Sequence, residues 1–132
     1  MLERKEIVLG RRGAILAEIQ ALYEQINEYR RDIEELEEER FCIRQQYTTI
    51  DEVNKSVIHY DMTYGDDWKG NLETEAEEYR EEIYYTTDTA LNEMLELIDD
   101  INRIIEAINE LIEKCYAEIE ELEAELASLT EE

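Results

Sequence analysis

Apolar residues recur at alternating intervals of four and three along the first half of the chain. This heptad spacing is typical of an amphipathic helix with one apolar seam. Arg40 fills the single seam position that lacks an apolar side chain. The pattern predicts a helix over residues 14–60, while Gly10 and Gly13 leave residues 1–13 open, as either a fraying helix or a loose arm. The apolar seam positions are Ile15, Ile19, Leu22, Ile26, Tyr29, Ile33, Leu36, Ile43, Tyr47 and Ile50.

The second half of the chain shows the same spacing, with a change of phase near residue 87. Before the change the seam positions are Leu72, Ala76, Tyr79 and Ile83. After it they are Leu91, Met94, Ile98, Ile101, Ile105, Ile108, Ile112, Cys115, Ile119, Leu122, Leu126 and Leu129. Threonines lower helix propensity by only tenths of a kcal/mol each. The spacing therefore predicts a helix over residues 72–129 with a local kink at the threonine cluster.

Residues 61–71 separate the two patterns and contain the signals of a turn. Two glycines and three aspartates interrupt the apolar spacing there. A connection of this length favours antiparallel neighbours. We therefore expect an all-α protein, with residues 1–132 forming one long antiparallel two-helix hairpin of coiled-coil type.

The apolar stripe of the second predicted helix widens between residues 91 and 112. Leu95, Leu97, Ile104 and Leu111 add to the seam, and one partner helix cannot cover them all. Exposed apolar area of this kind marks an interaction surface. We expect either a partner helix pair that completes a four-helix bundle or a homodimer through the same face. The predicted interface residues are Leu91, Leu95, Leu97, Ile98, Ile101, Ile104, Ile105, Ile108, Leu111 and Ile112.

The charge of the chain is strongly negative and unevenly distributed. The formal net charge is −24, and residues 71–132 hold 21 of the 37 acidic residues but only three of the 13 basic ones. Such a field repels nucleic-acid phosphates and anionic membrane surfaces. The acidity either keeps the protein soluble or attracts a basic partner.

Residues that could carry chemistry are scarce. His59 is the only histidine, which excludes a catalytic triad, a His-based zinc site and a di-iron bundle, and we expect it on the surface. The aspartates of the turn do not have the spacing of a calcium-binding loop. Cys42 and Cys115 are expected to be reduced, buried small hydrophobes. The sequence predicts a protein that is not an enzyme and has no cofactor or metal.

The turn carries a short motif, Trp68-Lys69-Gly70. It resembles the Trp-x-Gly motif that joins the two helices of the WXG (ESAT-like) proteins of type VII secretion. The length of the chain and its acidic second half are similar to the YwqH-like branch of that superfamily. The resemblance implies a partner or targeting factor that binds the helical N-terminal domain of an LXG-type toxin, with a second small helical protein, and presents the toxin to the secretion machinery.

The same resemblance implies a Tyr-x-x-x-Asp/Glu secretion signal after the second helix. Tyr116 and Glu120 have this spacing, as do pairs that begin at Tyr47 and Tyr84, but only Tyr116 lies near the carboxyl end. We therefore take Tyr116 and Glu120 as the candidate signal.

Two further expectations concern location and alternatives. The sequence shows neither a membrane span nor a signal-peptide core. The protein is thus expected in the cytoplasm or exported through a type VII system. A structural coiled-coil homodimer with no secretion role remains the alternative, whereas a prefoldin-like chaperone would need strand-forming hairpins for which residues 61–71 are too few.

Overall fold

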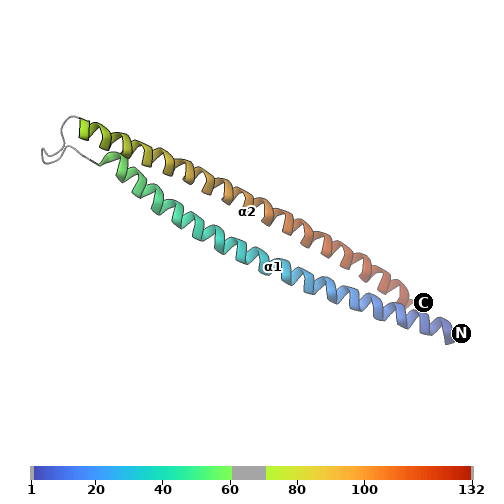
Figure 1. The fold of residues 1–132 in the computed structure, drawn as a ribbon. Coiled ribbons are helices and arrows are strands. Elements are labelled where there is room, and N and C mark those ends of the chain that lie inside the picture. Colours follow the sequence, from blue (N-terminus) through green and yellow to red (C-terminus); the bar gives the residue numbers. More distant parts are fainter. Residues whose placement is uncertain (1, 61–70, 132) are drawn as a thin grey trace. The chain divides into compact units, whose positions relative to one another are not determined.

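The computed structural model describes residues 2–60 and 71–131, which form two long antiparallel helices (Figure 1). Helix α1 spans Leu2–His59 and helix α2 spans Asn71–Glu131. The chain has no proline to interrupt either helix. The prediction of an all-α antiparallel hairpin is confirmed. The motif Trp68-Lys69-Gly70 lies outside the described residues.

Helix α1 begins well before the predicted start near residue 14. Gly10 and Gly13 both lie within the helix, in open space. A glycine inside a helix costs about 1 kcal/mol relative to alanine, and the surrounding good helix formers tolerate this cost. The early residues are therefore helical, and the alternative of a loose arm is wrong.

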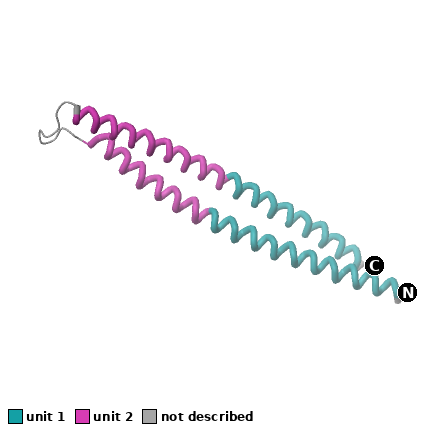
Figure 2. Tube along the Cα trace, in the orientation of Figure 1, with its two compact units in different colours: residues 1–36, 103–132 teal, residues 37–102 magenta. Residues whose placement is uncertain are grey.

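The hairpin divides into two compact units, each made of one segment from each helix (Figure 2). Unit 1 comprises residues 1–36 and 103–132, and unit 2 comprises residues 37–102. The two units bury different kinds of side chain.

Unit 1 has an apolar seam. Its buried cluster contains Ile26, Ile112, Cys115 and Ile119. Half-buried apolar side chains pack against this cluster, as the heptad spacing predicts; they are Ile19, Leu22, Tyr29, Ile33 and Ile108.

One pair of charges fixes the register of unit 1 beside its seam. Arg11 donates from Nε to Glu125 Oε1 at 2.9 Å and from Nη2 to Glu125 Oε2 at 3.0 Å. Both side chains are partly exposed, so the pair contributes about 0–1 kcal/mol. The two-pronged geometry specifies the alignment of the helices more than it stabilises them.

Unit 2 has a mixed seam. Leu91, Ile98 and Ile101 are buried in it. Polar side chains take several of the other positions. Arg40 donates to Asn102 Oδ1 at 2.7 Å, and Arg80 donates to the Tyr60 backbone carbonyl at 2.7 Å. The Arg80 guanidinium thus lies at the carboxyl end of α1, where a cation is favoured by the helix dipole.

The predicted seam before residue 87 is wrong at three of its four positions, whereas Ala76 is half-buried. Leu72, Tyr79 and Ile83 are exposed, and Arg80, Tyr84 and Thr87 take the seam positions instead. These three residues lead into Leu91 at intervals of four, three and four, so α2 keeps the phase of its longer apolar run. The seam therefore has the same phase before and after the threonines. Only the series of apolar residues shifts by one position there, so the apolar residues before residue 87 lie beside the seam.

Unit 2 is expected to open more readily than unit 1, because its seam buries less apolar surface. Hydrogen exchange of the isolated protein tests this directly. Backbone amides of residues 108–119 are expected to exchange more slowly than those of residues 77–87. Equal protection of the two segments would contradict this difference between the seams.

Asn54 is the one buried polar residue in the described part of the seam. Its Nδ2 donates to the Tyr84 backbone carbonyl at 3.1 Å, while its Oδ1 has no partner. A polar residue at a seam position specifies register at a cost in stability. The apolar spacing did not predict Asn54, because it follows Ile50, the last apolar residue of the predicted seam, by four positions and is itself polar. Ile50 is exposed, so the prediction that it lies in the seam is wrong.

Replacing Asn54 with leucine is expected to raise the free energy of unfolding by about 1 kcal/mol, since it removes an unsatisfied buried acceptor. The Tyr84 carbonyl keeps its place in the helical hydrogen-bond ladder. Chemical denaturation measures the change. Asn92→Leu, at an exposed position of the same unit, is the matched control and is expected to leave stability unchanged. Loss of stability in Asn54→Leu would show that the amide stabilises the seam.

Candidate helix-binding face

The ten predicted interface residues separate into two groups in the structure. Six of them face the other helix of their own unit: Leu91, Ile98, Ile101 and Ile112 are buried, and Ile105 and Ile108 are half-buried. They are not available to a partner while the hairpin is closed. The other four, Leu95, Leu97, Ile104 and Leu111, are exposed by 39–48%. Of the ten predicted interface residues, only these four are therefore accessible to a partner helix.

Three of the exposed residues share one position of the heptad. Leu97, Ile104 and Leu111 are spaced by seven, and each directly precedes a seam residue of α2. Leu97 belongs to unit 2, whereas Ile104 and Leu111 belong to unit 1. Leu95 lies on the opposite flank of the seam, three positions before Ile98.

The same heptad position continues toward the amino end of α2. Ile83, at 54% exposure, directly precedes Tyr84, and Tyr79 is exposed four residues earlier. Both were predicted to lie in the seam, so the sequence reasoning missed them as surface residues. The seam positions from Leu91 onward could have identified them. Counting back from these positions in steps of seven puts Tyr84 in the seam and Ile83 beside it.

The candidate secretion signal lies within α2, in unit 1, so the expectation of a signal after the second helix is not met. Tyr116 accepts a hydrogen bond from Arg30, whose guanidinium also lies 6.0 Å from the centroid of the Tyr116 ring. Glu120 is exposed one turn later on the same helix. Tyr116 is thus partly engaged in holding α1 against α2, and its hydroxyl already has a protein partner.

The remaining candidate residues have no arrangement that suggests chemistry. Cys115 is buried, as predicted, but Cys42 is exposed, so the prediction for Cys42 is wrong; it precedes the seam residue Ile43 and turns outward. Both cysteines are unpaired. His59 is exposed at the end of α1, as predicted. Within residues 2–60 and 71–131, no group of acidic, histidine and cysteine side chains could hold a metal ion.

One titration shift stands out on the exposed surface of α1. Lys55 pairs with Asp51 at 2.9 Å, one turn earlier, and the hydrogen bond to Asp51 raises the pKa of the Lys55 ammonium above its ordinary 10.5. A raised lysine pKa means that the contribution of the pair is present below about 10.5 and is lost as pH rises above it. The pair therefore does not respond to pH near neutrality.

Comparison with protein-family models, curated proteins and solved structures gave no match. Neither described helix contains a stretch apolar enough to cross a membrane. The features that bear on function are the exposed apolar residues of α2 and the Trp68-Lys69-Gly70 motif of the sequence.

Proposed function

We propose that this protein is a non-catalytic helical partner and targeting factor. Its α2 helix pairs with the helical N-terminal domain of an LXG-type toxin, and the complex is presented to a type VII secretion system. The pairing completes a four-helix bundle in which the hairpin supplies two helices.

The observation that supports pairing is the row of exposed apolar side chains at one heptad position of α2. Leu97, Ile104 and Leu111 recur at the spacing by which a helix contacts a second partner. Each is about half exposed, so covering one contributes about 1 kcal/mol of apolar burial. Leu97 in unit 2, and Ile104 and Leu111 in unit 1, thus each favour association.

The assignment to type VII secretion rests on the sequence. Trp68-Lys69-Gly70 lies between the two helices, at the place where the WXG proteins carry their motif. In this proposal the motif contacts the secretion machinery, and Tyr116 with Glu120 forms the signal near the carboxyl end.

A homodimer is the second candidate. The same exposed residues could be covered by a second copy of the chain, with no role in secretion. The charge of α2 disfavours this arrangement, because residues 81–102 contain seven acidic residues and no basic one, and a second copy would bring the same charges to the interface.

Substituting Trp68 tests the secretion role. Trp68→Ala is expected to reduce export of the toxin by about tenfold or more, since aromatic anchors dominate interface energies. The complex with the toxin should still form, because the substitution leaves the exposed face of α2 unchanged. Phe41→Ala, which truncates an exposed aromatic residue of α1, is the control. Unchanged export in Trp68→Ala would remove the functional role given to the motif.

A further inference from the structure

The unit 2 part of α2 has an exposed apolar surface that the mixed seam does not use. Leu72, Tyr79, Ile83 and Leu97 are exposed there, while Arg80 and Tyr84 lie inward. Leaving apolar side chains in water while polar ones occupy the seam is unfavourable for a hairpin that acts alone. Of the four exposed residues of the predicted interface, this surface includes only Leu97.

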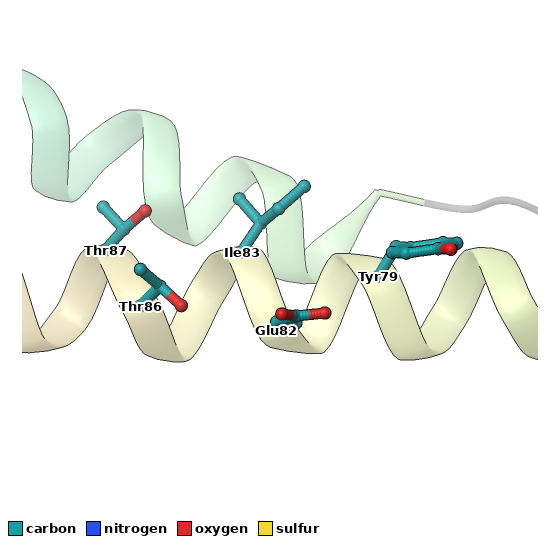
Figure 3. A pocket seen from close by; sticks show the side chains of 5 residues that line it. All are labelled: Tyr79, Glu82, Ile83, Thr86 and Thr87. Carbon is teal, nitrogen blue, oxygen red and sulfur yellow. The ribbon is translucent and has the colours of Figure 1, made fainter.

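The surface includes an open groove. It is lined by Tyr79, Glu82, Ile83, Thr86 and Thr87, which lie on consecutive turns of α2 (Figure 3), and its volume is about 410 Å³. Its bottom is largely apolar, from Ile83, the Tyr79 ring and the threonine methyl groups, and the Glu82 carboxylate stands at its side. A branched aliphatic side chain with a cationic neighbour fits this combination.

Helix α1 adds one apolar side chain to the same flank. Val53 is exposed and directly precedes the seam residue Asn54, just as Ile83 directly precedes the seam residue Tyr84. In an antiparallel pair, positions that hold this relation to their seams lie on the same side. Val53 and Ile83 therefore lie on the same flank of unit 2.

The acidic side chains around this surface favour a basic partner. Glu82, Glu93 and Glu96 are exposed beside it, and α2 carries no lysine or arginine between residues 81 and 102. A second copy of this chain would place like charges together, which is unfavourable at an interface. An apolar helix with lysines or arginines along its flanks would match both the apolar stripe and its acidic rim.

We infer that Val53, Tyr79, Ile83 and Leu97 form a docking site for an amphipathic partner helix with basic flanks. The inference rests on the proposed function in that the helix belongs to the toxin's N-terminal domain. It adds the chemistry of the partner and extends the interface within unit 2 to Val53, Tyr79 and Ile83. The acidic side chains beside the site attract a helix with basic flanks, and the apolar side chains of the site pack against the apolar face of that helix.

Two helical peptides with the same leucine and isoleucine heptads test the inference. One carries lysine and the other glutamate at the flanking positions, and fluorescence anisotropy measures their binding to the full chain. The lysine peptide is expected to bind about tenfold or more tightly than the glutamate peptide, and its binding is expected to weaken with added salt. Equal binding of the two peptides would overturn the inference.

Two substitutions separate docking from simple charge attraction. Ile83→Glu is expected to weaken binding of the lysine peptide by about tenfold or more, because it removes an apolar contact from the groove. Phe41→Glu adds the same charge at an exposed apolar position on α1 and is expected to leave binding unchanged. If both variants bind like the wild type, or if both change binding equally, the docking site is not at Ile83.

Failure of this docking site can be distinguished from failure of the proposed function. A toxin complex that forms normally with Ile83→Glu would overturn this docking site and leave the proposed function standing. Conversely, selective loss of lysine-peptide binding in Ile83→Glu, together with no toxin complex from the wild type, would support the site and overturn the toxin as its partner.

Discussion

Replacing Ile26 with alanine is expected to lower the free energy of unfolding by about 3 kcal/mol. Ile26 is only 1% exposed and lies in the buried cluster of unit 1 with Ile112, Cys115 and Ile119. The substitution removes apolar contacts and leaves a cavity that two packed helices close only in part. Chemical denaturation followed by circular dichroism measures the loss.

Ile7→Ala is the matched control for this substitution. Ile7 lies on the same helix and in the same unit, but its side chain is 71% exposed. The control changes the same atoms and the same helix propensity, and is expected to alter stability by no more than about 0.5 kcal/mol. Similar losses in the two variants would show that unit 1 does not have the tightly packed seam described above.

The double substitution Leu97→Asp and Ile104→Asp is expected to weaken the complex with the helical partner by about 100-fold, or about 2.7 kcal/mol. Both side chains are 48% exposed in the hairpin. The carboxylates would remain hydrated in the free protein but would have to be desolvated against an apolar helix in the complex. Titration of the purified partner against each variant measures the change.

A charge-matched control distinguishes this effect from a general increase in negative charge. Ile7→Asp combined with Leu9→Asp places two carboxylates at exposed apolar positions near the start of α1. This control is expected to bind the partner as the wild type does. Thermal unfolding of both double variants should match that of the wild type, since none of the four side chains belongs to a buried cluster. Normal binding by the Leu97 and Ile104 variant would place the interface elsewhere.

Heptad spacing predicted the helical pair and the unit 1 seam well. Ile15, Ile26 and Ile119 are buried where the intervals of four and three place them. This part of the chain is predictable because its apolar residues and its packing have the same phase. The local pattern and the tertiary contacts then indicate the same face of each helix.

The unit 2 seam was not predictable by the same reasoning. Tyr79 and Ile83 continue an apolar pattern, yet Arg80 and Tyr84 are the inward residues. A count of apolar positions follows hydrophobicity alone, whereas the helix follows the phase set by its longest buried run. In the docking site proposed above, the outward apolar residues are the ones that would contact another helix.

The candidate site was predictable in part. The sequence indicated that α2 is too apolar for one partner helix, and four of the ten residues it identified are exposed. It could not separate them from the six residues that face α1, since both sets are leucines and isoleucines within the same stretch. Only the pairing of the two helices assigns each side chain to the seam or to the surface.

The intact native mass of the complex recovered from the source cells, through a tag on this protein, tests the central claim most directly. The account predicts a heteromer that contains a larger protein with a helical N-terminal domain. A bare homodimer, at twice the 15.8 kDa of one chain, would contradict the targeting role and leave a structural coiled coil in its place.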